Sequence, residues 1–180
     1  MDTGEFWDLV EQARRQTDDV TDTEAMAEAA TGLLAARPVE DIVAAEQVLD
    51  RLLAESYRAP LWGAAYMING GCSDDGFDHF RGWLIMQGRE VFERAVGDPE
   101  ALADLRVVRD AEAEGFDLMC EDALGIVWNA HLSATGHELP AAAPTDGLPE
   151  LDPAWDFDFD DSDELARRLP RLSALFELEH

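Results

Sequence analysis

Apolar residues recur every three or four positions along most of this chain, which is the spacing of amphipathic helices. The first stretch with this spacing begins close to the N-terminus and contains Phe6, Leu9, Val10 and Ala13. Its acidic residues come early and its two arginines come late, as the helix dipole favours. Few segments show the alternation typical of a strand. The pattern therefore predicts an all-α fold built as a single helical domain.

Start and stop signals divide this pattern into separate helices. A Thr-x-x-Glu capping box at Thr21 predicts a second helix that runs through Leu34. Pro38 at an early helical position predicts a third helix, which Pro60 is expected to end or kink. The almost wholly apolar run over residues 61–68 then predicts a buried helix, closed by an Asn-Gly-Gly sequence.

The central helix is predicted to begin at Ser73 and to continue to Val96. Serine is a preferred N-cap residue, and two aspartates follow in the first turn, where the helix dipole favours negative charge. Shorter helices are predicted up to Leu105 and over residues 117–132. We expect the core to include Trp62, Tyr66, Phe77, Phe80 and Leu84.

The composition changes near residue 133. Glycines and prolines recur from there to Pro153 and make regular secondary structure improbable. A final short helix is predicted from the apolar stripe formed by Leu165, Leu169, Leu172 and Leu175. The chain is therefore divided into a helical domain over residues 1–132 and a Pro-rich, acidic strap over residues 133–177, with the last helix packed on that domain. Residues 178–180 resemble the remnant of an expression tag.

The strap contains seven carboxylates between Asp152 and Glu164. Three aromatic residues, Trp155, Phe157 and Phe159, alternate with them. Exposing three aromatic side chains to water is unfavourable by roughly a few kcal/mol. We therefore expect the aromatics to dock on the helical domain while the aspartates face solvent. The alternating acids fail as an EF-hand loop, because the required glycine and the closing glutamate are absent.

The net charge of −27 restricts the partners that this chain can bind. It contains no lysine, a bias that indicates a GC-rich bacterial genome, and its arginines form no extended cluster. Direct binding to nucleic acid and adsorption to anionic lipid are both disfavoured by this charge. A basic protein partner or a small ligand remains open, and we expect no cofactor. Two cysteines, no leader-like start and no apolar run of about 20 residues favour a reduced cytoplasmic protein.

Candidate chemistry is concentrated around the start of the central helix. Asp74, Asp75 and His79 lie within a turn and a half, and Arg81 and Arg89 follow. Carboxylates with an imidazole suit a divalent metal or acid–base chemistry. In the competing interpretation Ser73 and the two aspartates only cap the helix. Arg81 is expected either to form a structural ion pair or to point into a polar pocket, because an unpaired buried guanidinium is costly.

Cys72 lies just before the same helix, where the dipole lowers a thiol pKa. A reactive thiol with His79 as its base is therefore a second hypothesis for this region. Nucleophilic catalysis also needs an orienting third group and an oxyanion hole, and the sequence identifies neither. We predict no metal ligands, and no catalytic residue can be assigned.

Several sequence stretches resemble a bacterial family, the domain-of-unknown-function family 4240. These are Phe6-Trp7, the run from Tyr57 to Tyr66, Gly71-Cys72-Ser73-Asp74-Asp75-Gly76-Phe77 and Phe80-Arg81-Gly82-Trp83-Leu84-Ile85. The resemblance covers roughly the first 130 residues and implies no established activity. It adds a faint indication of a regulatory or interaction role. The function predicted is a non-enzymatic binding or regulatory interaction module; the alternative is a hydrolase-like, metal-dependent or acid–base enzyme centred on the Ser-Asp-Asp-Gly segment.

Overall fold

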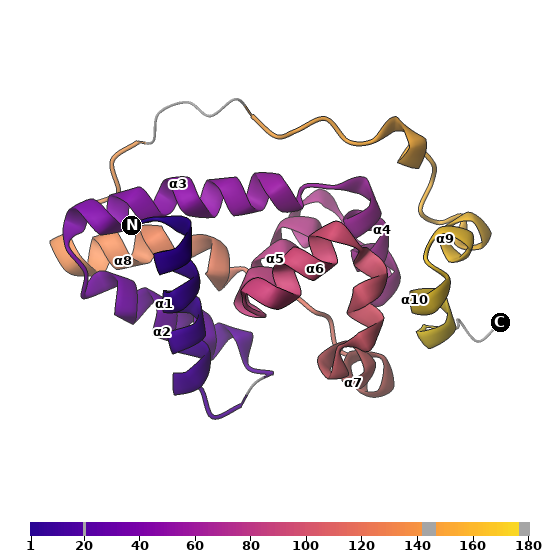
Figure 1. Cartoon of the computed structure of the whole chain (residues 1–180), viewed down its shortest axis with the longest axis horizontal. Helices are drawn as coiled ribbons and strands as arrows, with labels where there is room; N and C mark the ends of the chain where they lie inside the picture. Colours follow the sequence, from indigo (N-terminus) through magenta and orange to yellow (C-terminus); the bar gives the residue numbers. More distant parts are fainter. Residues whose placement is uncertain (20, 142–146, 177–180) are drawn as a thin grey trace.

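Every regular element in the described part of the chain is a helix (Figure 1). The computed structural model describes residues 1–19, 21–141 and 147–176. The all-α fold is thereby confirmed. The elements in chain order are α1 Thr3–Gln16, α2 Thr23–Ala35, α3 Val39–Ser56, α4 Ala59–Ile68, α5 Asp74–Met86, α6 Arg89–Gly97, η1 Pro99–Asp104, α7 Arg106–Glu114, η2 Asp122–Gly125, α8 Ile126–Thr135, η3 Pro153–Trp155, α9 Ser162–Arg168 and α10 Pro170–Leu175.

The helices form two groups that share α5. At one end of the molecule α2 packs against α1 and α8, and α3 packs along α8. Toward the other end α4 and η1 contact each other and also contact α10 (Figure 1). Helices α8 and α9 lie at opposite ends of the molecule, although they are consecutive α-helices in the described part of the chain (Figure 1). None of the helices in the described ranges has the length and apolar character needed to cross a membrane.

The core is centred on α5. Three of the five residues that the sequence predicts to lie in the core belong to this helix and are buried there. Phe77, Phe80 and Leu84 are fully buried, and burial of each such side chain contributes about 1.5–3 kcal/mol. Trp62 and Tyr66 are partly buried and pack against this core, so they lie at its edge and not in its interior as predicted. They lie four residues apart on one face of α4, beside the face that carries its buried residues Leu61, Ala64, Ala65 and Ile68.

The predicted central helix is in fact two helices, which is a second correction. Its N-cap is Ser73, whose hydroxyl accepts a hydrogen bond from Gly76 N at 3.1 Å, but α5 ends at Met86. Gly88 follows with φ +89°, a conformation that favours glycine. A Cβ at this position would clash with the Glu11 carboxylate of α1. The left-handed conformation of Gly88 therefore separates α5 from α6.

Other helix boundaries also differ from the prediction. Asp22, not Thr21, caps α2 by accepting from Ala25 N at 2.9 Å, while the Thr21 hydroxyl bonds to Asp19 at 2.7 Å. Pro60 lies in the first turn of α4 rather than at the end of α3. Residues 116–120 are not helical, so the helix predicted over 117–132 starts later. The sequence pattern predicts no helix over residues 106–114, where α7 lies.

The C-terminal segment (residues 147–176) contains the 3-10 turn η3 and then two short α-helices, α9 and α10, where the sequence predicts one final helix. Pro170 has no N–H to continue α9 and instead occupies the first turn of α10. Residues 138–141 and 147–152 carry no helix, and 142–146 lie outside the described residues. The continuous Pro-rich strap and the division at residue 133 therefore stay predictions. The suspected tag remnant, 178–180, also lies outside the described residues.

Aromatic and acidic side chains of the C-terminal segment alternate in exposure. Trp155, Phe157 and Phe159 are partly buried against the core, whereas the aspartates between them are exposed. The Phe159 ring meets Tyr66 of α4 edge to face, with centroids 5.7 Å apart. The Arg168 guanidinium lies over the Trp155 ring at 4.9 Å. These contacts place the aromatics toward α4 and α9.

Candidate functional site

The start of α5 is organised as a helix cap. Asp74 and Asp75 are exposed in the first turn, where they complement the helix dipole. In the described part of the chain, no hydrogen bond joins the His79 ring to Asp75 or Cys72, and no group of three His, Cys, Asp or Glu side chains could hold a metal ion. The His79 backbone carbonyl accepts from Cys120 N at 2.9 Å. These contacts are those of a packed helix end, and a ligand site here stays a prediction.

Arg81 forms the ion pair that one of its two interpretations expected. Its side chain is buried and its guanidinium donates to the Asp78 carboxylate and to the Leu53 carbonyl. The same guanidinium lies over the rings of Tyr57 and Phe77, at 5.1 and 5.0 Å. Only its Nε lacks a partner among the described residues. Arg81 therefore holds α3 and α5 together.

Arg89 belongs to a different helix from Arg81. It lies at the start of α6 and pairs with Glu93 on the same helix at 2.7 Å, with both side chains more than half exposed. The break at Gly88 separates it from the N-terminus of α5. The sequence placed Arg81 and Arg89 on one helix, and that placement was wrong.

The Cys72 thiol is not activated by its position before α5. Burial, with a smaller contribution from the Asp78 carboxylate, raises the pKa of the Cys72 thiol to about 12. A reactive thiol needs the opposite shift, because the thiolate is the nucleophile. Burial and the neighbouring Asp78 carboxylate both disfavour the thiolate form of Cys72.

A hollow that the sequence did not predict lies between α2, η2 and α8. We call it the acidic groove; it has a volume of about 520 Å³ and is lined by Asp22, Glu24, Ala25, Ala27, Glu28, Thr31, Asp122 and Asn129. Its lining contains no arginine. Glu24, Glu28 and Asp122 form no ion pair within the described ranges, while Asp22 caps α2. The groove is therefore strongly negative and uncompensated.

Cys120 helps to hold the two walls of the acidic groove together. Its Sγ donates to the Thr23 carbonyl at 3.5 Å, which ties the segment before η2 to the first turn of α2. This contact brings Asp122 close to Asp22 and Glu24, which are far from it in the sequence. Burial raises the pKa of the Cys120 thiol, so it remains a neutral donor.

An apolar stripe on α8 adjoins the groove. Trp128 is 45% exposed and Leu132 is 36% exposed, which is high for such large apolar side chains. They are four residues apart, and Asn129 of the groove lies three residues before Leu132. Residues at these spacings share one face of a helix. Trp128 and Leu132, the α8 stripe, therefore extend the acidic groove with an apolar surface.

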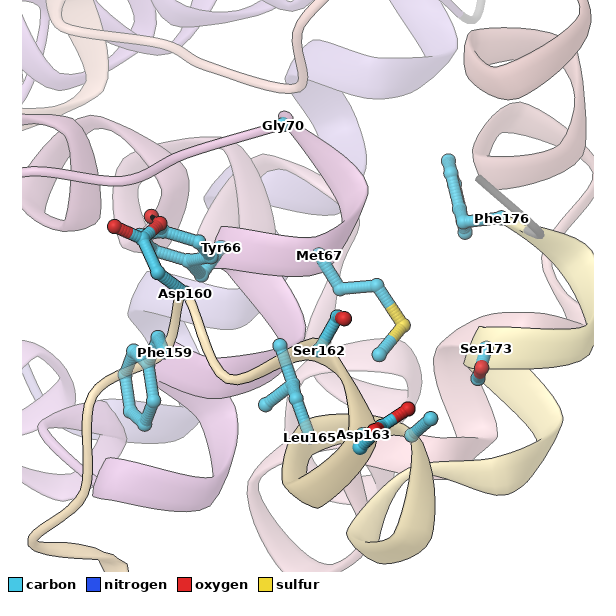
Figure 2. A pocket seen from close by; sticks show the side chains of 11 residues that line it. Tyr66, Met67, Gly70, Phe159, Asp160, Ser162, Asp163, Leu165, Ser173 and Phe176 are labelled. Carbon is cyan, nitrogen blue, oxygen red and sulfur yellow. Dashed lines mark hydrogen bonds between the residues drawn. The ribbon is translucent and has the colours of Figure 1, made fainter. Parts of the chain in front are cut away.

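A second hollow lies between α4 and the C-terminal segment (Figure 2). This C-terminal pocket has a volume of about 490 Å³ and is lined by Tyr66, Met67, Gly70, Phe159, Asp160, Ser162, Asp163, Leu165, Ala166, Ser173 and Phe176. The Tyr66 hydroxyl donates to the Asp160 carboxylate, and this hydrogen bond raises the pKa of Tyr66. None of the five candidate residues from the sequence lines the groove or this pocket.

Comparison with known proteins identifies the family. A family model described as a protein of unknown function, DUF4240, matches residues 1–131. The chain belongs to the DUF4240 family. No curated protein and no solved structure matches it. The acidic groove and Trp128 lie within the matched DUF4240 region, whereas the C-terminal pocket also needs residues 159–176, beyond that region.

Proposed function

We propose that the DUF4240 region of this chain is a non-enzymatic interaction module that binds a basic, amphipathic segment of a protein partner. The observation that carries this proposal is the acidic groove, with its uncompensated carboxylates, lying beside the exposed α8 stripe. Each of the two features fits one half of such a segment. Arginine or lysine side chains pair with the groove, and an apolar side chain packs on the stripe.

The electrostatics favour a partner with several separate cations. Glu24 and Glu28 come from α2 and Asp122 from η2, so the carboxylates are spread along two walls rather than gathered at one point. The whole chain carries a net charge of −27, which attracts a cationic partner over a longer range. Rim charges of this kind mainly raise the association rate and make binding sensitive to salt.

The α8 stripe supplies the apolar contact that charge alone lacks. A tryptophan is enriched among the residues that dominate binding energy at protein interfaces. Trp128 has more than a third of its surface free, and Leu132 lengthens the same face by one turn. A helix whose apolar residues recur at three and four positions fits this surface.

A synthetic peptide of about 14 residues, made of leucine and lysine with the leucines on one helical face, tests the proposal. Its binding is measured by isothermal titration calorimetry at low and at high salt. The double substitution Glu24→Gln and Glu28→Gln is expected to weaken binding about tenfold at low salt, because two carboxylates are lost. Trp128→Ala is expected to weaken it about tenfold as well.

The matched control carries the same charge change elsewhere. Glu112→Gln with Glu114→Gln removes two exposed carboxylates from α7, outside the groove. It is expected to change the affinity by less than about twofold. A peptide of the same composition with its leucines scattered around the helix should bind more weakly. Equal losses in both double variants would mean nonspecific attraction and would contradict the proposal.

A further inference from the structure

Part of the lining of the C-terminal pocket is apolar. Met67 of α4 reaches toward α9, and Leu165 and Phe176 form further walls (Figure 2). Its volume of about 490 Å³ is in the range of small-molecule sites. The thioether of Met67 adapts its shape to different apolar groups, which suits a wall that contacts a ligand.

The polar groups in this pocket are acidic or neutral. Asp160 and Asp163 contribute carboxylates, and Ser162 and Ser173 contribute hydroxyls that form no hydrogen bond within the described residues. Asp160 already accepts from the Tyr66 hydroxyl through one of its oxygens. Asp163 is exposed and forms no ion pair in the described part of the chain.

The arginines near this pocket form ion pairs with other carboxylates. Arg167 and Arg168 both pair with Glu164, at 2.6 and 2.7 Å. Arg171 pairs with Asp104, and its backbone N donates to Glu100 at 2.6 Å. No arginine lines the pocket. Neither Asp160 nor Asp163 pairs with an arginine in the described part of the chain.

We propose that the C-terminal pocket binds a small organic ammonium ion with an apolar body. The cation pairs with Asp163 on the α9 side of the pocket, whereas Asp160 and the rings of Tyr66 and Phe159 lie together on its other side (Figure 2). The apolar body packs on Met67 and Leu165. An anion of the same shape is repelled, and a neutral analogue leaves the Asp163 carboxylate unpaired. This site is independent of the proposed partner-binding groove, because the two share no residue.

The probe is n-hexylammonium, and the readout is the ε-methyl signal of Met67 in protein labelled with ¹³C at its methionine methyl groups. The signal is assigned by its loss in Met67→Leu. The signal is expected to shift saturably with n-hexylammonium and at least about tenfold more weakly with n-hexanol, which has the same body without charge. A capped peptide with one central lysine tests whether the pocket binds a lysine side chain of a protein in place of a small amine. Stronger binding of that peptide than of n-hexylammonium would overturn the small-ligand proposal.

Two variants and one matched control locate the binding. Asp163→Asn is expected to weaken n-hexylammonium binding about tenfold, because it removes one charge from the pocket. Ala166→Leu adds volume on the pocket lining and is expected to abolish binding. Asp156→Asn makes the same charge change on an exposed residue of the same segment that does not line the pocket, and affinity should be unchanged. Equal binding of n-hexanol, no shift of the Met67 signal, or an equal loss in Asp156→Asn would overturn the proposal.

Discussion

Gly82 of α5 faces the backbone carbonyl of Cys120 so closely that a Cβ at position 82 would clash with the carbonyl oxygen. The clash involves backbone, so no rotation of a flexible side chain relieves it. One turn earlier on α5, His79 O accepts a hydrogen bond from Cys120 N at 2.9 Å. The segment before η2 is therefore seated directly on α5, and the absence of a side chain at position 82 allows it.

Gly82→Ala is expected to destabilise the protein by about 3 kcal/mol, measured by urea unfolding, because the added methyl group forces two backbones apart. Gly32→Ala is the matched control. Gly32 is exposed within α2 and nothing lies within 4 Å of the added Cβ. It should stabilise the protein by about 0.5–1 kcal/mol through helix propensity. Similar effects of the two substitutions would show that Gly82 is not a contact position.

Asp78→Ala is expected to cost about 2 kcal/mol, because it leaves the buried Arg81 guanidinium without its carboxylate. The half-exposed position of Asp78 reduces the loss below that of a fully buried pair. Arg81→Met should cost less, since Asp78 then returns to water and the Leu53 carbonyl still accepts from the Ser56 hydroxyl. Chemical denaturation of both variants measures which of them has lost more of its free energy of unfolding. A larger loss for Arg81→Met would contradict this account.

Ser73→Ala is expected to cost about 1 kcal/mol, because Gly76 N loses its acceptor at the N-terminus of α5. Asp75→Ala should change the free energy of unfolding by less than about 0.5 kcal/mol, as an exposed side chain with only a weak dipole contribution. Thermal unfolding measures both. If Asp75→Ala were the more destabilising of the two, a role beyond capping would be indicated for that carboxylate.

Cys72 is expected to react with iodoacetamide at pH 8 about a hundredfold or more slowly than free cysteine. Its pKa is raised to about 12, so thiolate, the reactive form, is scarce at that pH and increases only as the pH rises. The Cys120→Ser variant isolates Cys72 for mass spectrometry. A rate that levels off below pH 9 would show an ordinary or lowered pKa and would restore the reactive-thiol hypothesis.

Gly63→Leu is expected to displace Trp155, because even a Cβ at this position of α4 would lie 3.0 Å from the indole ring and 3.1 Å from Leu165. The emission of Trp155 is obtained by subtracting the spectrum of a Trp155→Phe variant. It should be blue-shifted and poorly quenched by acrylamide in the unsubstituted protein, and red-shifted in the Gly63→Leu variant. Red-shifted, readily quenched emission with glycine in place would show that Trp155 is not docked.

The sequence determined the helical character of this chain and the start of its central helix. Both depend on neighbouring residues: the spacing of apolar positions is local, and Ser73 bonds to a backbone N–H three residues away. Phe77, Phe80 and Leu84 were predictable as core because they repeat on one helix face. The acidic charge, which motivates a cationic partner, is also a property of composition alone.

Tertiary structure decided where helices break and which side chains converge. Gly88 ends α5 next to Glu11 of α1, and no local pattern reveals that neighbour. Asp22 and Asp122 share a groove only because α2 packs on η2 and α8. Periodicity tells which face of a helix is apolar, but it does not tell which other helix covers that face. Sites built from several helices therefore depend on the packing, whereas a capped helix end can be recognised from the sequence.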